Sequence, residues 1–254
     1  MPRRIVISGA SSGLGKALAR HYLKRGAIVA AIARRGELLQ VMAAEFPGQM
    51  LCYALDVRDS ASLQQAAEDF IARYGCPDVV IANAGVSTGT LTEHAEDIAV
   101  FQAVMDINLM GMVKTFQPFI PPMRMAQAGT LVGIASVAGF RGLPGASAYS
   151  ASKSAVISYL ESLRVELRDS GIKVVTICPG YIRTPMTVPN PYPMPFIIDA
   201  GEAAKRMVHA IDRQTSFTVI PWQMGLIGLV LNILPRWIFD RVFVNAPRKP
   251  RVRV

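Results

Sequence analysis

The sequence contains few cysteines and histidines, and neither type is spaced as in a metal site. Among 254 residues there are three of each: Cys52, Cys76, Cys178, His21, His94 and His209. No two cysteines are separated by the short interval typical of zinc ligands, and the histidines lie far apart. We therefore predict no metal site. Three unpaired thiols indicate a reducing compartment, so a cytoplasmic location is predicted.

The chain also lacks a balancing number of acidic residues, since its formal net charge is +9. Arg248, Lys249, Arg251 and Arg253 near the end supply four of the nine charges, which leaves five for the rest. The basic residues are scattered and are not interleaved with aromatic residues, which argues against nucleic-acid binding. A polyanionic cofactor explains the excess more economically. Residues 5–8 read as a strand, so no secretory signal is predicted at the start.

Short apolar runs alternate with helical patterns along the chain, and its length fits one domain over residues 1–254. The runs are apolar throughout, as expected of parallel strands covered by helices on both faces. We predict a single doubly wound α/β domain of Rossmann type, with a mainly parallel seven-stranded sheet. The predicted strands are residues 5–8, 28–33, 50–55, 79–82, 130–136, 173–178 and 217–220.

A glycine-rich turn follows the first predicted strand and precedes a helical pattern. Glycines at this point let the backbone approach a pyrophosphate, which the amide hydrogens and the positive end of the helix then bind. The spacing is Gly-x-x-x-Gly-x-Gly; an ordinary flexible turn is the alternative. The candidate cofactor residues here are Gly9, Ser11, Ser12, Gly13, Leu14 and Gly15.

The end of the second strand indicates which dinucleotide is bound. An acidic residue there would bind the ribose hydroxyls of NAD, but the position is occupied by Ala33. Arg34 and Arg35 follow, and a guanidinium can pair with a 2′-phosphate. NADP(H) is therefore the preferred cofactor and NAD(H) the less favoured one. The alternative is that both arginines are simply solvated in a loop.

Tyr149 and Lys153 are four residues apart, which places them on one face of a helix. There the ammonium can favour the phenolate and make the tyrosine an acid-base catalyst. Ser136 ends the fifth strand and can face the same crevice. Two hydroxyl donors aimed at a carbonyl oxygen would stabilise the alkoxide that forms during hydride transfer. A solvated surface pair of tyrosine and lysine is the alternative.

In order and spacing, several motifs together resemble the short-chain dehydrogenase/reductase family over roughly the first 220 residues. They are the glycine turn, Asp56-Val57, Asn83-Ala84-Gly85, Asn108, Ser136, Tyr149 with Lys153, and Pro179-Gly180 with Thr184. The resemblance implies that Asp56 and Val57 contact the adenine. It also implies that Lys153 binds the nicotinamide ribose.

The resemblance implies further roles at the nicotinamide end. Asn108 would hold a water that links Lys153 to solvent, while Thr184 would bind the carboxamide and Ile182 would pack beside the ring. Local alternatives stay open, because Thr184 also fits a loop cap and Asn108 a helix kink. For Asp56, capping of the next helix is less favoured, since Asp59 is a better cap.

The substrate side is predicted to be apolar. Residues 184–196 contain five prolines and cannot form a regular helix, so residues 181–200 are interpreted as a lid. Tyr192, Met194 and Phe196 offer apolar surface, although they could simply pack the lid onto the domain. A small apolar ketone, aldehyde or secondary alcohol fits best.

Residues 222–243 are predicted to form one unusually apolar helix, followed by the basic tail to residue 254. The apolar run is too short to span a bilayer. The segment could lie on a membrane surface as a peripheral contact, or be buried against the domain or another subunit. The resemblance favours a homodimer or homotetramer.

Together the motifs predict an NADP-dependent oxidoreductase that transfers a hydride between nicotinamide and an apolar carbonyl compound or alcohol. Asn108, Ser136, Tyr149 and Lys153 are the predicted catalytic residues. The alternative is a catalytically silent NADP-binding regulatory protein, which has no need of all four residues.

Overall fold

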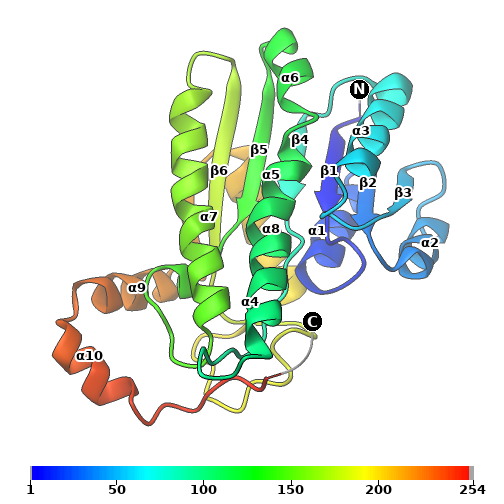
Figure 1. Cartoon of the computed structure of the whole chain (residues 1–254). Coiled ribbons are helices and arrows are strands. Elements are labelled where there is room, and N and C mark those ends of the chain that lie inside the picture. The colour runs from blue at the N-terminus through cyan, green and yellow to red at the C-terminus, as the bar shows by residue number, and fades with distance from the viewer. Residues whose placement is uncertain (1, 252–254) are drawn as a thin grey trace.

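The computed structural model describes residues 2–251, so Arg253 of the predicted basic tail lies outside the described part. A seven-stranded, wholly parallel sheet forms the centre, in the order β3-β2-β1-β4-β5-β6-β9 (Figure 1). This confirms the predicted fold class. The strands are β1 (Arg4–Ser8), β2 (Ile28–Ala33), β3 (Met50–Ala54), β4 (Val79–Ala82), β5 (Gly129–Ile134), β6 (Ile172–Pro179) and β9 (Phe217–Ile220). Four strands, β1, β3, β5 and β6, differ from the predicted ranges by one or two residues at one or both ends.

Helices cover both faces of the sheet, which explains why its strands are apolar throughout. In β1, Ile5 and Ile7 face one core, whereas Val6 between them faces the other. The first core is completed by helices α1 (Gly13–Lys24), α2 (Gly36–Ala44) and α8 (Ala200–Asp212). The second is completed by α3 (Ser60–Tyr74), α5 (Gly111–Phe116), α6 (Ile120–Ala126) and α7 (Ser147–Glu166).

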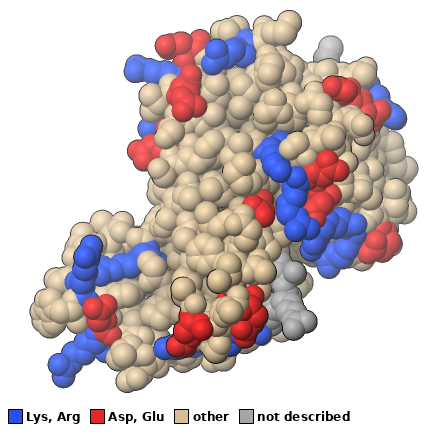
Figure 2. All heavy atoms as spheres, viewed as in Figure 1, with Lys and Arg blue, Asp and Glu red and all other residues tan. Residues whose placement is uncertain are grey.

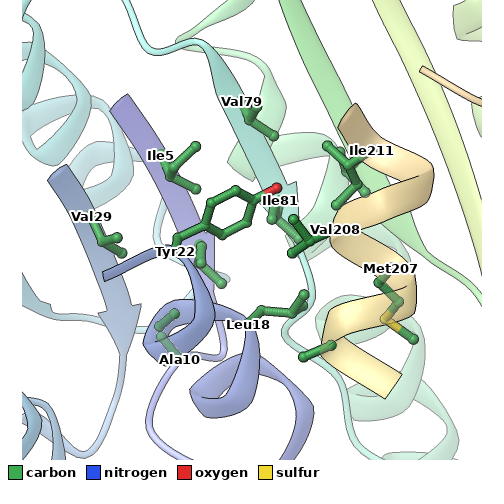
Figure 3. Packing of buried hydrophobic residues seen from close by; sticks show 14 of the residues in the cluster. Ile5, Ala10, Leu18, Tyr22, Val29, Val79, Ile81, Met207, Val208 and Ile211 are labelled. Atoms are coloured by element: carbon green, nitrogen blue, oxygen red, sulfur yellow. The ribbon is translucent and has the colours of Figure 1, made fainter. Parts of the chain in front are cut away.

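In the first core, α1 and α8 pack against each other and against the central strands. Figure 3 shows the Tyr22 ring of α1 beside Ile81 of β4. Val208 and Ile211 of α8 lie next to them. All four side chains are buried. Burial of each such side chain stabilises the fold by about 1.5–3 kcal/mol. This packing fixes the start of α1, which carries the glycine turn.

The strand order creates the crevice that a doubly wound sheet offers to ligands. β1 lies between β2 and β4, and the chain leaves β3 at one edge to return on the other side of β1. Ligands bind such sheets outside the carboxyl ends of the strands at this reversal. The glycine turn after β1 and Asn83 after β4 therefore lie at the same place.

The predicted lid contains no regular helix, as its prolines require, but it is anchored by a short two-stranded sheet. β7 (Ile182–Arg183) pairs with β8 (Ile198–Asp199), and turns connect them. A salt bridge between Arg183 and Asp199 also joins these two strands. The lid is thus a loop closed at its base.

The prediction of one helix over residues 222–243 is wrong. The segment forms α9 (Gln223–Ile233) and α10 (Arg236–Phe243), which project from the domain as a helical arm (Figure 1). Pro235 has no backbone N–H and forces Leu234 into an extended conformation, ψ 125°, so the helix ends there.

The helical arm leaves much apolar surface exposed. Met224 and Gly228 of α9 are buried, and a carbon added at Gly228 would lie 2.2 Å from the Phe140 ring. The outward faces expose Trp222, Leu226, Leu229, Val230, Ile233, Trp237 and Val242. Figure 2 shows this projection as mostly uncharged surface with a few basic side chains and an acidic group among them. The arm is therefore only partly covered by its own domain.

One helical run is long and apolar enough to cross a membrane by length and composition alone, at residues 97–126. It comprises α4 (Asp97–Met105), the π-helical turn η1 (Asp106–Met110), α5 and α6. Ile107, Met112 and Phe116 of this run are buried in the second core. Part of its apolar surface is thus packed on the sheet.

Candidate functional site

A cleft of about 430 Å³ opens at the carboxyl ends of the central strands. It brings together every predicted cofactor and catalytic residue except Asn108. These residues are Gly9, Ser11, Ser12, Gly13, Leu14, Gly15, Arg34, Arg35, Asp56, Val57, Asn83, Ala84, Gly85, Ser136, Tyr149, Lys153, Pro179, Gly180, Ile182 and Thr184.

The glycine turn has the geometry that a pyrophosphate site needs. Gly9 has φ +71°, a conformation that favours glycine, and a carbon added at Gly15 would lie 2.2 Å from the Gly9 carbonyl oxygen. The first turn of α1 carries no acidic residue, so its positive end faces the cleft without a competing charge. These features fit the diphosphate of a dinucleotide.

Asn83 ties the ends of β1 and β4 together beside this turn. Its side-chain amide donates to the carbonyl oxygens of Ser8 at 3.0 Å and Gly9 at 3.3 Å. The Ser8 hydroxyl accepts from the backbone N–H groups of Asn83 and Ala84 at 3.1 and 3.2 Å. Asn83 is therefore a positioning residue for the glycine turn.

The two arginines after β2 behave differently. Arg35 donates to the hydroxyls of Ser12 at 2.7 Å and Ser11 at 3.2 Å, which bridges the second strand to the glycine turn. Arg34 also lines the cleft, and its charge helps to lower the pKa of Asp56. Hydrogen bonding by Arg58 is the larger cause of that lowered pKa. The end of β2 is therefore positive, and the Asp56 carboxylate in the same cleft is already paired with Arg58.

Asp59 caps α3, as the sequence favoured. Its carboxylate accepts from the backbone N–H groups of Ala61 at 3.0 Å and Ser62 at 3.1 Å. Asp56 accepts instead from the backbone and side chain of Arg58. Asp56 is thus not needed as the cap and lies in the cleft.

Ser136 and Tyr149 meet at the far end of the cleft. Ser136 follows β5 and accepts from the backbone N–H of Ala138 at 3.1 Å, which fixes its hydroxyl. Tyr149 is the third residue of α7. Burial raises the pKa of Tyr149, while hydrogen bonding with Ser136 lowers it by less. The net direction is opposite to the predicted one, because desolvation outweighs the stabilisation of the phenolate.

Lys153 lies one turn further along α7, on the same face as Tyr149. Its Nζ is 5.8 Å from the centre of the Tyr149 ring and donates to the Ile134 carbonyl at 2.8 Å. Its side chain is only 4% exposed, and this burial lowers its pKa to about 8. The pair therefore consists of a buried Lys153 and a half-buried Tyr149 at the cleft, and is not a solvated helix face.

Asn108 lies behind the cleft, fully buried in the π-helical turn η1. Its Oδ1 accepts from the backbone N–H of Val86 at 2.8 Å, and its Nδ2 donates to the Val86 carbonyl at 3.0 Å. The same Nδ2 donates to the Ser152 hydroxyl at 2.9 Å. The helix is therefore locally distorted at Asn108, and its amide bonds to a side chain as well as to backbone. The water that Asn108 would hold stays a prediction.

Four further apolar residues line the cleft and were not predicted to do so: Leu55, Ile107, Ile134 and Ala135. The order of motifs gave no signal for them, since their exposure to the cleft depends on how the strands and helices pack. Val86 after β4 and Met186 and Thr187 of the predicted lid also border the cleft. Burial raises the pKa of Tyr192 in the lid, and the nearby Tyr149 adds to this effect. Among residues 2–251, no group of three His, Cys, Asp or Glu side chains could hold a metal.

Comparison with known proteins agrees with this geometry. The family model described as short chain dehydrogenase matches residues 3–192. An uncharacterized oxidoreductase of Myxococcus xanthus is 36% identical over 241 residues, covering 94% of this chain and 95% of that protein. The 11-beta-hydroxysteroid dehydrogenase-like 2 protein of Arabidopsis thaliana is 32% identical, covering 95% and 82%.

Solved structures agree as well. The crystal structure of a short-chain dehydrogenase from Streptomyces avermitilis has a TM-score of 0.81 at 26% identity, covering 96% of this chain and all of that one. The chain therefore belongs to the short-chain dehydrogenase/reductase family, a family of oxidoreductases.

Proposed function

We propose that this protein is an NADP-dependent oxidoreductase that interconverts an apolar ketone or aldehyde and the corresponding alcohol. The observation that carries the proposal is one cleft that contains both the glycine turn and a group formed by the half-buried Tyr149 and the buried Ser136 and Lys153. A phosphate site at one end and two hydroxyl donors at the other match the needs of nicotinamide-dependent carbonyl reduction.

The glycine turn and Arg34 would hold NADPH, which would supply a hydride for the carbonyl carbon when bound. As the hydride arrives, negative charge develops on the carbonyl oxygen. Ser136 and Tyr149 donate hydrogen bonds to that oxygen, and Tyr149 transfers its proton to give the alcohol. The ammonium of Lys153 stabilises the phenolate that remains. Asn108 positions this group through Ser152, which lies next to Lys153 and also donates to the Tyr149 carbonyl at 2.8 Å.

An apolar substrate is supported by the surroundings of Tyr149. Val86 and Met186 both line the cleft, and the rings of Tyr181 and Tyr192 lie 6.3 Å apart in the lid. Apolar and aromatic walls with a few polar groups are typical of sites for small hydrophobic ligands. The relative named after hydroxysteroid dehydrogenases is consistent with this class.

Loss of NADPH absorbance with a panel of small and hydrophobic carbonyl compounds tests the proposed function. Steady turnover of an apolar ketone or aldehyde supports it. NADPH binding without turnover of any carbonyl, and without oxidation of the matching alcohols by NADP, would favour the regulatory protein instead.

Cofactor preference depends on Arg34. The Arg34→Ala variant is expected to lower kcat/KM for NADPH by about tenfold or more, because a hydrogen bond to a charged group contributes roughly 1.5–3 kcal/mol. The value for NADH should change little, since NADH lacks the 2′-phosphate. The exposed Arg213 is a matched control, and Arg213→Ala should leave both values unchanged. Equal use of both cofactors by the unmodified protein would contradict the preference.

The helical arm is proposed to form contacts between subunits of a homodimer or homotetramer. Trp222 and Trp237 are 65% and 70% exposed, and large exposed apolar patches usually mark interaction surfaces. Trp237→Ser is expected to shift the protein toward monomers in sedimentation velocity experiments, whereas Met125→Ser, at an exposed residue of α6, should not.

A different result would assign the arm to another role. A monomeric protein that binds anionic vesicles through Trp237 would indicate a peripheral membrane contact.

Cys52, Cys76 and Cys178 are all free thiols, which supports the proposed location in a reducing compartment such as the cytoplasm.

A further inference from the structure

The end of the chain returns from the helical arm to the substrate side of the domain. We refer to residues 246–251 as the C-terminal strap. In Figure 1 this red segment runs from α10 beneath the carboxyl ends of the strands, toward the lower end of α4. The backbone N–H of Gly89 donates to the Pro250 carbonyl at 2.9 Å, and Lys249 Nζ donates to the Ser87 hydroxyl at 2.9 Å. The strap is therefore bonded to the loop that follows β4.

Arg251 clamps the end of the strap. Its guanidinium donates to both carboxylate oxygens of Asp97, at 2.8 and 3.1 Å, and to Glu96 at 2.7 Å. Asp97 is buried and also accepts from the backbone N–H of Leu91 at 2.8 Å. A buried carboxylate that loses its partner is destabilised, so this pair gives the strap a defined position.

Two glycines allow the strap to approach the loops closely. A carbon added at Gly89 would lie 2.2 Å from the Lys249 carbonyl oxygen and 2.9 Å from that of Pro250. Gly145, with φ +74°, would place its added carbon 2.8 Å from Cβ of Arg248. Since the contacts at Gly89 are with backbone atoms, any side chain there must displace the strap.

The same loops hold the start of the catalytic helix. Thr90 donates its backbone N–H to the Gly145 carbonyl at 3.1 Å, and its hydroxyl accepts from the N–H of Ala148 at 3.2 Å. Tyr149 follows Ala148 directly. Val86, which lines the cleft, immediately precedes Ser87, to which the strap is bonded. The strap is thus bonded to Ser87 and Gly89, which directly adjoin Val86 and Thr90 in the sequence.

We infer that the C-terminal strap forms the outer wall of the substrate entrance and limits the size of the carbonyl compound that reaches Tyr149. The lid lines the cleft through Met186, and the strap is bonded to the loop after β4, which lines the cleft through Val86. Residues 248–251 are accordingly specificity-determining rather than catalytic. This inference rests on the proposed oxidoreductase function.

The test compares a small and a bulky apolar ketone in three variants. Arg251→Ala releases the clamp, Gly89→Ala displaces the strap at its middle, and Arg164→Ala is a control on the exposed face of α7. The first two should raise the ratio of kcat/KM for the bulky ketone over the small one by about tenfold, the scale of one misfit methylene group. NADPH affinity should stay unchanged in all three. The ratio should not move in Arg164→Ala.

A ratio that stays constant in both strap variants, with NADPH affinity intact, would overturn the inference while leaving the proposed function standing. If the unmodified protein reduces no carbonyl at all, the proposed function fails. The strap is then tested by quenching of the fluorescence of bound NADPH with a bulky nitroxide. Stronger quenching in Arg251→Ala and Gly89→Ala supports a wall at the entrance, and unchanged quenching refutes it.

Discussion

Replacement of Tyr149 by phenylalanine is expected to lower the turnover number for carbonyl reduction by about 10²- to 10⁴-fold, the range that a positioned proton donor contributes. The ring remains and only the hydroxyl is lost, so the fold and the affinity for NADPH should stay close to those of the unmodified protein. Stopped-flow or steady-state loss of NADPH absorbance gives the rate, and fluorescence titration gives the affinity.

The expected effect follows from the protonation state of the pair. Burial raises the pKa of Tyr149, so its hydroxyl remains protonated through the neutral range and can act as the acid. Burial also lowers the pKa of Lys153 to about 8, so its positive charge is present below that pH and lost above it. Reduction should therefore be fastest on the acidic side of about pH 8 and decline as the pH rises.

A matched control separates the loss of a proton donor from a general disturbance of α7. Tyr159 lies on the same helix, away from the cleft, and is partly buried. Tyr159→Phe should keep the turnover number within about twofold, as expected of a substitution outside the reacting centre. If Tyr149→Phe retains the activity of Tyr159→Phe, Tyr149 is not the proton donor and the proposed mechanism is wrong.

The fold and the composition of the cleft could be predicted because their signals are local. Uniformly apolar strands predicted a sheet covered on both faces, and the position of each motif at a strand end placed it at one edge of that sheet. The four-residue interval between Tyr149 and Lys153 requires only a helix to place both on one face. The helix cap at Asp59 could likewise be predicted from a few neighbouring residues.

Other features depend on contacts between distant parts of the chain and could not be predicted in this way. The direction of the Tyr149 pKa is decided by burial, which periodicity does not reveal. Arg251 was interpreted as part of a charged tail, but its partner Asp97 lies 154 residues away along the chain. Pro235 is different, because its effect on the predicted C-terminal helix was local and was missed.

The second large effect concerns the cofactor end. Gly15→Ala is expected to weaken NADPH binding by about 100-fold or more, because oriented backbone N–H groups and the helix end supply the diphosphate site. The added carbon would lie 2.2 Å from the Gly9 carbonyl oxygen and 2.5 Å from Nδ2 of Asn83. To relieve this overlap, the glycine turn must move away from α1, and the hydrogen bonds from Asn83 to Ser8 and Gly9 must lengthen.

Fluorescence titration of NADPH and thermal unfolding together test this prediction. Gly201 is the matched control, since it also lies in a helix, and a carbon added there would meet nothing within 4 Å. Gly201→Ala should keep the affinity and raise the free energy of unfolding slightly, by up to about 1 kcal/mol. A Gly15→Ala protein that unfolds at the unmodified temperature and binds NADPH equally well would show that the cofactor does not depend on this turn. Loss of affinity in a folded Gly15→Ala protein, with Gly201→Ala unaffected, would instead locate the diphosphate between the first strand and α1.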